Sequence, residues 1–276
     1  MVKKLLKHEC IYYFRTFSLF LPIVLVIGVM ARVFRFLEND NAPPEINVVV
    51  ENAIFSSTTM LLVSCAALLV LATVIGIVRF YKNMYSAEGY LTFTLPVTNA
   101  QHIFVKLLVA TVWQMLCFLT VIAAGSIALA GDDSLGVLEL LDWGIEGVLE
   151  MCGTGHVIAY IVELILLAIL SVVANMLLYY ACITVGQLAK KNRILLAIGA
   201  YFIYYIASQV ITTVVTIVVT VAGMTSNLAD IVNWVIRHYV ASIHIYLVGA
   251  IILTAVMAAV FWLVTQTIMT KKLNLE

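Results

Sequence analysis

One ionisable side chain lies well inside an apolar stretch, and it has polar neighbours at helical spacing. Glu163 occurs in the run 157–188, and we find no second carboxylate as clearly embedded. A charge at the centre of a membrane helix costs at least about 2.5 kcal/mol on insertion scales, so we expect it to face protein or a water-filled cavity. In a helix it shares a sector of about 120° with four polar residues, namely His156, Tyr160, Ser171 and Asn175. This sector either lines a transport pathway or bonds to a neighbouring helix, and both interpretations stay open.

A second polar stripe follows one face of the run 194–222. Its members are spaced four, three, four and four residues apart: Tyr201, Tyr205, Ser208, Thr212 and Thr216. Small hydroxyl side chains at this spacing are typical of helix packing in membranes, so we favour a helix–helix contact over substrate contact. The candidate pathway or packing residues are therefore Tyr160, Glu163, Asn175, Ser208 and Thr212.

Motifs for catalysis and for nucleotide binding are absent from the sequence. It has no Gly-x-x-x-x-Gly-Lys-Ser/Thr phosphate loop, so the chain does not bind ATP by that route. The His8-Glu9 pair lacks the second histidine of a His-Glu-x-x-His zinc site, and there is no Gly-x-Ser-x-Gly elbow. The five cysteines have no metal-ligand spacing. We expect a protein that is not an enzyme, with no catalytic residue, cofactor or metal of its own.

The segment 79–102 carries the most informative pattern in the chain. Within sixteen residues it has seven large apolar or aromatic side chains, namely Phe80, Tyr81, Tyr85, Tyr90, Leu91, Phe93 and Leu95. Exposed patches of this kind mark a partner surface or a membrane surface. Gly89 permits a sharp turn, and Pro96 ends the element before it. Thr98 and Gln101 have the spacing of a capping box, which predicts a new helix start.

The elements that hold these residues follow from the composition. Of 276 residues, 64% are hydrophobic and 11% are charged, with a formal net charge of zero and a mean hydropathy of +1.10. A soluble domain is nearer half apolar and a quarter charged, so this chain has too few polar residues to cover a water-exposed globule. The same figures exclude disordered, nucleic-acid-binding and disulfide-rich classes. We predict an all-α polytopic membrane protein.

Six apolar runs are long enough to cross about 30 Å of hydrocarbon: 17–36, 54–78, 103–130, 157–188, 194–222 and 241–270. No long polar linker or internal repeat interrupts them, so we predict a single transmembrane domain over 1–276. The stretch Lys190–Arg193 fits a tight hairpin. Residues 2–17 are predicted to form an amphipathic interfacial helix, with these side chains toward the lipid: Val2, Leu5, Leu6, Tyr13 and Phe17. A cleaved signal peptide is the less favoured alternative, because no small-x-small site follows the first run.

Charge gives the orientation of the predicted spans. With both termini in the cytoplasm, twelve Lys and Arg residues lie inside and three lie outside, which is a strong positive-inside bias. The segment 79–102 is then cytoplasmic, between the second and third spans. The longest outer loop, 131–154, has an acidic stripe at helical spacing, which either forms a lid at the outer mouth or simply meets water.

The cytoplasmic segment resembles a known family. The run Glu88-Gly-Tyr-Leu-Thr-Phe-Thr-Leu-Pro-Val-Thr, followed by Lys106, is similar to the loop between spans two and three in permeases of type-2 ABC (ATP-binding cassette) exporters. The likeness is greatest to small six-span permeases of Gram-positive gut bacteria. In topology it covers the whole chain, whereas only this loop is specific in sequence. In that family the loop docks a separate ATPase chain, and the resemblance implies this role for Tyr85, Ser86, Glu88, Gly89, Tyr90 and Leu91.

The resemblance implies a permease subunit in a bacterial cell membrane that exports an unidentified amphipathic substrate. ATP and Mg²⁺ then bind to the partner ATPase. The implied partners are ABC ATPase subunits, a second identical or related permease and membrane lipid, but not nucleic acid. The family often has a larger helical excursion between spans five and six, whereas here the longest outer loop lies between spans three and four, so the outer gate stays unassigned.

Three alternatives stay open beside this interpretation. The loop alone is equally compatible with an interfacial helix whose aromatic side chains rest among lipid headgroups. The whole chain is alternatively a non-transporting membrane scaffold or sensor component. It is also compatible with an ATP-independent secondary transporter, although such proteins usually bury several titratable groups.

Overall fold

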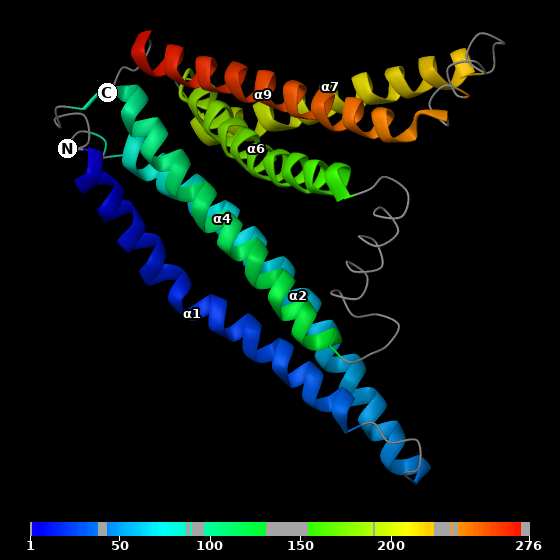
Figure 1. Ribbon diagram of the computed structural model, residues 1–276. Helices are drawn as coiled ribbons and strands as arrows, with labels where there is room; N and C mark the ends of the chain where they lie inside the picture. The colour runs from blue at the N-terminus through cyan, green and yellow to red at the C-terminus, as the bar shows by residue number, and fades with distance from the viewer. Residues whose placement is uncertain are drawn as a thin grey trace. The chain divides into compact units, whose positions relative to one another are not determined.

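The computed structural model describes residues 2–37, 43–86, 89, 97–130, 154–189, 191–223, 233 and 237–271. Its helices are α1 (Val2–Phe36), α2 (Pro44–Tyr85), α4 (Asn99–Leu129), α6 (Thr154–Gly186), α7 (Arg193–Gly223) and α9 (Tyr239–Lys271), as Figure 1 shows. In these parts of the chain, six helices are long and apolar enough to cross a membrane. The prediction of an all-α chain with six helices able to cross a membrane is confirmed for the described residues. The positions of the termini and the bacterial cell membrane stay predictions.

The helices extend beyond the apolar runs that predicted them. The longest, α2, has 42 residues, which corresponds to about 63 Å at the helical rise and roughly twice the hydrocarbon thickness. Glu45 lies in its first turn and Lys82 in its last turn, and both charges complement the helix dipole. Hydropathy gave only 54–78 because it does not register the polar turns through which a helix continues.

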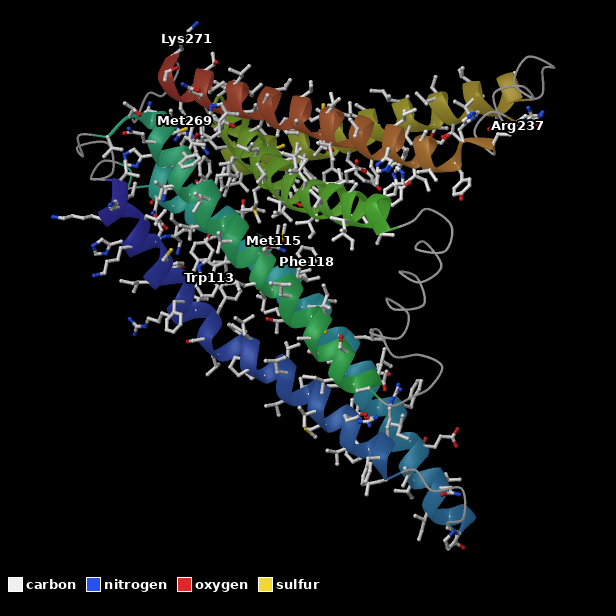
Figure 2. The ribbon with its side chains drawn as sticks, viewed as in Figure 1. Trp113, Met115, Phe118, Arg237, Met269 and Lys271 are labelled. Atoms are coloured by element: carbon white, nitrogen blue, oxygen red, sulfur yellow. The ribbon has the colours of Figure 1, made fainter. Side chains whose placement is uncertain are left out.

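The N-terminal part of the chain corrects one prediction. Residues 2–36 form one continuous helix, α1, and the expectation that Tyr13 and Phe17 face lipid is wrong, because these side chains are 3% and 0% exposed. Both rings stack against the indole of Trp113 from α4, with ring centroids 6.4 and 5.7 Å from that of the indole. Trp113 is labelled in Figure 2. The prediction failed because the amphipathic pattern of one helix does not show whether lipid or a second helix covers its aromatic face. The interfacial position of residues 2–17 stays a prediction.

By their contacts, the described residues group into two compact units. Unit 1 comprises Met1–Arg79 and Gln101–Met151, and it contains α1, most of α2 and nearly all of α4. Unit 2 comprises Phe80–Ala100 and Cys152–Glu276, and it contains the last turns of α2 with α6, α7 and α9. The single domain over 1–276 stays a prediction.

In unit 1, α1 and α4 approach closely at Gly28. A Cβ atom at this position would lie 2.8 Å from the carbonyl oxygen of Ala124, so only glycine fits without displacing the backbone. Val24 and Ile27 are buried on α1 beside this contact, and Ala128 is buried on α4. Small residues that let two helix backbones approach are the usual device of helix packing in membranes.

In unit 2, α6 packs against both α7 and α9. A short turn joins Gly186 of α6 to Arg193 of α7, with Asn192 in the left-handed region at a φ of 63°. The predicted tight hairpin is therefore confirmed. Tyr179 and Tyr201 stack across these two helices with ring centroids 5.7 Å apart.

Candidate coupling site

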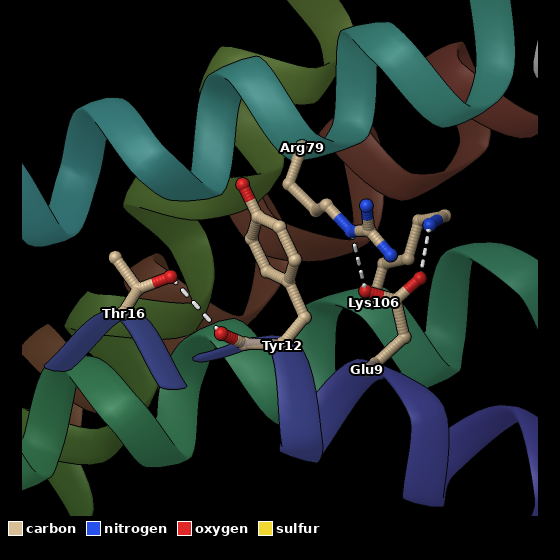
Figure 3. A network of polar contacts seen from close by, with 5 residues as sticks. All are labelled: Glu9, Tyr12, Thr16, Arg79 and Lys106. Atoms are coloured by element: carbon tan, nitrogen blue, oxygen red, sulfur yellow. Dashed lines mark hydrogen bonds and ion pairs between the residues drawn. The ribbon is translucent and has the colours of Figure 1, made fainter. Parts of the chain in front are cut away.

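A buried carboxylate in unit 1 binds the two helices that flank the predicted docking segment along the chain. Glu9 of α1 is 2% exposed. One of its oxygens accepts a hydrogen bond from Nε of Arg79 at 3.0 Å, and the other accepts one from Nζ of Lys106 at 2.7 Å (Figure 3). Arg79 belongs to α2 and Lys106 to α4, so a single carboxylate links three helices.

Further contacts fix this charged cluster in place. The guanidinium carbon of Arg79 lies 4.0 Å from the centroid of the Tyr12 ring, a cation–π contact from the turn after Glu9. Oγ1 of Thr16 donates to the carbonyl oxygen of Tyr12 at 3.0 Å. A buried ammonium group is stable only beside a counter-ion, which explains how Lys106 can occupy an otherwise apolar helix start.

The residues of the cluster lie on both sides of the segment Phe80–Ala100 along the chain. Arg79 is the last residue of unit 1 before the segment Phe80–Ala100, and the chain returns to unit 1 at Gln101, shortly before Lys106. Glu9 therefore binds both sides of a segment that itself belongs to unit 2. The helix start predicted at Thr98 is confirmed, because α4 begins at Asn99.

Within unit 2, the last turns of α2 pack against the C-terminal end of α6. Phe80 is fully buried and stacks on Tyr180, with ring centroids 3.9 Å apart and an angle of 10° between the planes. The hydroxyl oxygens of Tyr85 and Thr184 are 2.8 Å apart. Thr184 donates its own hydrogen to the carbonyl of Tyr180 at 2.7 Å, so Tyr85 is the donor to Thr184. This part of α2 is therefore in direct contact with α6.

Gly89 folds back onto the end of α2. Its amide donates to the carbonyl of Ser86 at 2.7 Å. A Cβ atom at position 89 would lie 2.9 Å from the carbonyl oxygen of Met84, so the close approach requires glycine. Oγ of Ser86 donates to the carbonyl of Lys82 at 2.6 Å. The remaining predicted docking residues lie outside the described residues: Glu88, Tyr90 and Leu91.

A second polar cluster joins the N-terminal parts of α6 and α9 in unit 2. Nδ1 of His244 lies 2.9 and 3.1 Å from the two carboxylate oxygens of Glu163, and its Nε2 lies 3.2 Å from Nδ1 of His156. The ring of Tyr160 stacks on His244 at 4.2 Å, and its hydroxyl donates to the carbonyl of Val240 at 2.9 Å. Three residues of the predicted polar sector thus contact one neighbouring helix.

The other candidate residues form hydrogen bonds within their own helices. These pairs are Asn175 with Ser171, Ser208 with Tyr205, and Thr212 with Thr216. Among the hydrogen bonds of the described residues, none joins Asn175, Ser208 or Thr212 to Glu163. The structure therefore divides the predicted set into one inter-helix cluster and separate intrahelical pairs.

The contacts of Glu9 and His244 were not predicted from the sequence. Lys106 in an apolar helix start was a signal that a buried acid had to lie nearby. For His244, 81 residues from Glu163, the signal was position. The fourth and sixth spans run in the same predicted direction, and both residues lie near the start of their runs, which is a pattern that could have paired them.

No family model, no curated protein and no solved structure matches this chain. The resemblance of the loop to ABC permeases therefore stands on the residues quoted for it.

Proposed function

We propose that this chain is the permease subunit of an ABC exporter, and that the segment Phe80–Ala100 receives motion from a separate ATPase chain. The observation that carries the proposal is the attachment of this segment. Glu9 binds Arg79 and Lys106 on its two sides, at 3.0 and 2.7 Å. A docking segment with loose ends would absorb the movement of its partner, whereas one held by a buried ion pair at both ends can transmit it.

The contacts of the segment with α6 supply the next step of the proposed mechanism. Nucleotide binding closes the ATPases and displaces the docking segment. The Phe80–Tyr180 stack and the Tyr85–Thr184 hydrogen bond carry the displacement to α6. The nucleotide thereby shifts the population between inward-facing and outward-facing states, and the permease needs no catalytic residue.

The proposed assembly has two permease chains, identical or related, and two ATPase chains in a bacterial cell membrane. ATP and Mg²⁺ bind to the ATPases. Both termini of the permease and the docking segment lie in the cytoplasm, as the distribution of Lys and Arg predicts. A bundle of apolar helices suits an amphipathic substrate, and the direction of transport rests on the family resemblance.

Two serines, one within α2 and one directly after its last residue, provide a test of docking. A photo-cross-linking amino acid is placed at Ser86, which is hydrogen-bonded to Gly89, or at Ser56, an exposed position of α2 within the apolar run 54–78. We expect irradiation of intact cells to link position 86 to an ABC ATPase and position 56 to none. Equal labelling at the two positions, or no ATPase adduct at 86, contradicts the proposal.

A further inference from the structure

We propose that His156, His244 and Glu163 form a proton-binding relay, in which a proton taken up at His156 passes through His244 to Glu163. This inference goes beyond the permease function and does not depend on it. The three side chains lie in one row within unit 2, joined by contacts of 3.2 and 2.9 Å. Histidine is the side chain that ordinarily exchanges protons near neutral pH, and two consecutive histidines ending on a carboxylate can pass one along.

The direction of the hydrogen bonds follows from the acceptor at the end of the row. An ionised Glu163 can only accept hydrogen bonds, so Nδ1 of His244 must carry a hydrogen and donate it. Neutral His244 then has a lone pair on Nε2, and Nδ1 of His156 must donate to it across 3.2 Å. This leaves Nε2 of His156 as the acceptor for a proton from water.

One proton can then pass along the row with every atom accounted for. Hydronium gives a proton to Nε2 of His156, whose Nδ1 gives its own to Nε2 of His244. Nδ1 of His244 gives its hydrogen to the carboxylate of Glu163. The histidines end as the opposite neutral tautomers, Glu163 ends as a carboxylic acid, and the charge of the cluster changes from −1 to zero.

The relay has one end that is exposed at the surface and one end that is more enclosed by protein. His156 is exposed, whereas the side chains of His244 and Glu163 are 23% and 19% exposed. The stacked ring of Tyr160, itself bonded to the carbonyl of Val240, holds the plane of His244. A fixed ring plane keeps both nitrogens directed at their partners.

No other carboxylate in the packed helices competes with Glu163 for the proton. On α6 the only charged residue is Glu163, and His156 and Tyr160 are the titratable neighbours that face the row. On α9 the other titratable residues are Tyr239, Tyr246 and Lys271, and Arg237 and His238 directly precede this helix. The titratable residues of α7 are Arg193, Tyr201, Tyr204 and Tyr205. In the described residues, no three His, Cys, Asp or Glu side chains are placed to hold a metal ion.

Two spectroscopic readouts test the relay in the purified full chain. At a pH where Glu163 is ionised, ¹⁵N-histidine NMR should show His244 as the tautomer protonated at Nδ1. Infrared spectra recorded after a rapid drop in pH should show a carboxylic acid band that Glu163→Gln removes. We expect His156→Ala to slow the appearance of this band roughly 100-fold, the usual effect of losing a positioned proton donor.

The controls separate the relay from a general effect on folding. His156→Ala leaves the Glu163–His244 contact between α6 and α9 in place, and His238→Ala removes a histidine outside the row. Unchanged band kinetics in His238→Ala, with slow kinetics in His156→Ala, support the relay. Equal kinetics in wild type and His156→Ala, an Nε2-protonated His244 beside ionised Glu163, or no band that depends on Glu163 would each overturn it.

Discussion

The carboxylate of Glu9 lies 2.7 Å from Nζ of Lys106, and each side chain is 3% exposed. The two residues are 97 positions apart in sequence and link α1 to α4. The attraction within a buried ion pair offsets the cost of removing both charges from water. Removing only one partner leaves the other charge buried without this compensation, so single substitutions have the strongest effect on stability. This asymmetry makes the pair testable.

Glu9→Gln should lower the free energy of unfolding by about 3 kcal/mol, because it leaves the ammonium group of Lys106 buried without its counter-ion. The double variant Glu9→Gln, Lys106→Met should recover part of this loss, since neither charge then remains in the α1–α4 contact. Thermal unfolding in detergent measures both effects, with Lys7→Ala on the exposed face of α1 as control. A double variant that loses the sum of the two single losses would show that the pair is not coupled.

Gly28→Val should destabilise unit 1 by about 1–3 kcal/mol, the usual cost of overpacking a close contact. The new Cβ would lie 2.8 Å from the carbonyl oxygen of Ala124, a backbone atom that cannot rotate away. Gly125→Val is the matched control, because a Cβ at Gly125 meets no atom within 4 Å. Denaturation midpoints of the two purified variants measure the difference, and equal midpoints would contradict the close packing of α1 on α4.

Local sequence patterns predicted the helices of this fold, but they did not predict which side chains of different helices are in contact. The apolar runs located the six long helices of the described residues, and Thr98 and the Lys190–Arg193 stretch predicted a helix start and a hairpin that these residues contain. Tyr13 and Phe17 were predicted to face lipid from the pattern of residues 2–17 alone. Their rings are buried by Trp113, a residue of another helix that this pattern does not include. Hydrophobic periodicity and mean hydropathy describe a single segment and carry no information about the segment that packs against it.

The candidate sites show the same limit. The turn at Gly89 was predicted from residue type, and the structure adds the reason, a Met84 carbonyl 2.9 Å from where a Cβ would lie. Glu163 was expected to face protein or water, but no partner on another helix was named for it. The pairing is a tertiary contact between α6 and α9, so the residues of α6 alone left its role open.

Gly89→Ala should weaken binding of the proposed ATPase while the chain still inserts into the membrane. The added methyl group displaces the docking turn from the carbonyl of Met84. Gly199→Ala on α7 is the control, because that position has open space and alanine favours a helix. Quantitative co-purification of the ATPase with each variant measures the effect. Equal recovery with both variants would mean that the turn at position 89 does not present the docking surface.

Glu163→Ala should destabilise unit 2 by about 1–3 kcal/mol, because His244 loses an acceptor from a neighbouring helix. Asn175→Ala on the same helix should have little effect, since Asn175 bonds to the carbonyl of Ser171 within α6. Thermal unfolding of the two purified variants separates an inter-helix contact from an intrahelical one. A larger loss for Asn175→Ala would contradict this assignment.

The most direct test of the proposed function is affinity purification of the tagged chain in mild detergent, followed by mass spectrometry of the bound proteins. The account predicts a stoichiometric ABC ATPase, together with a second copy of the chain or a related permease. Recovery of the chain without an ATPase, even after chemical cross-linking in cells, would contradict it. That result would favour a self-contained transporter or a membrane scaffold.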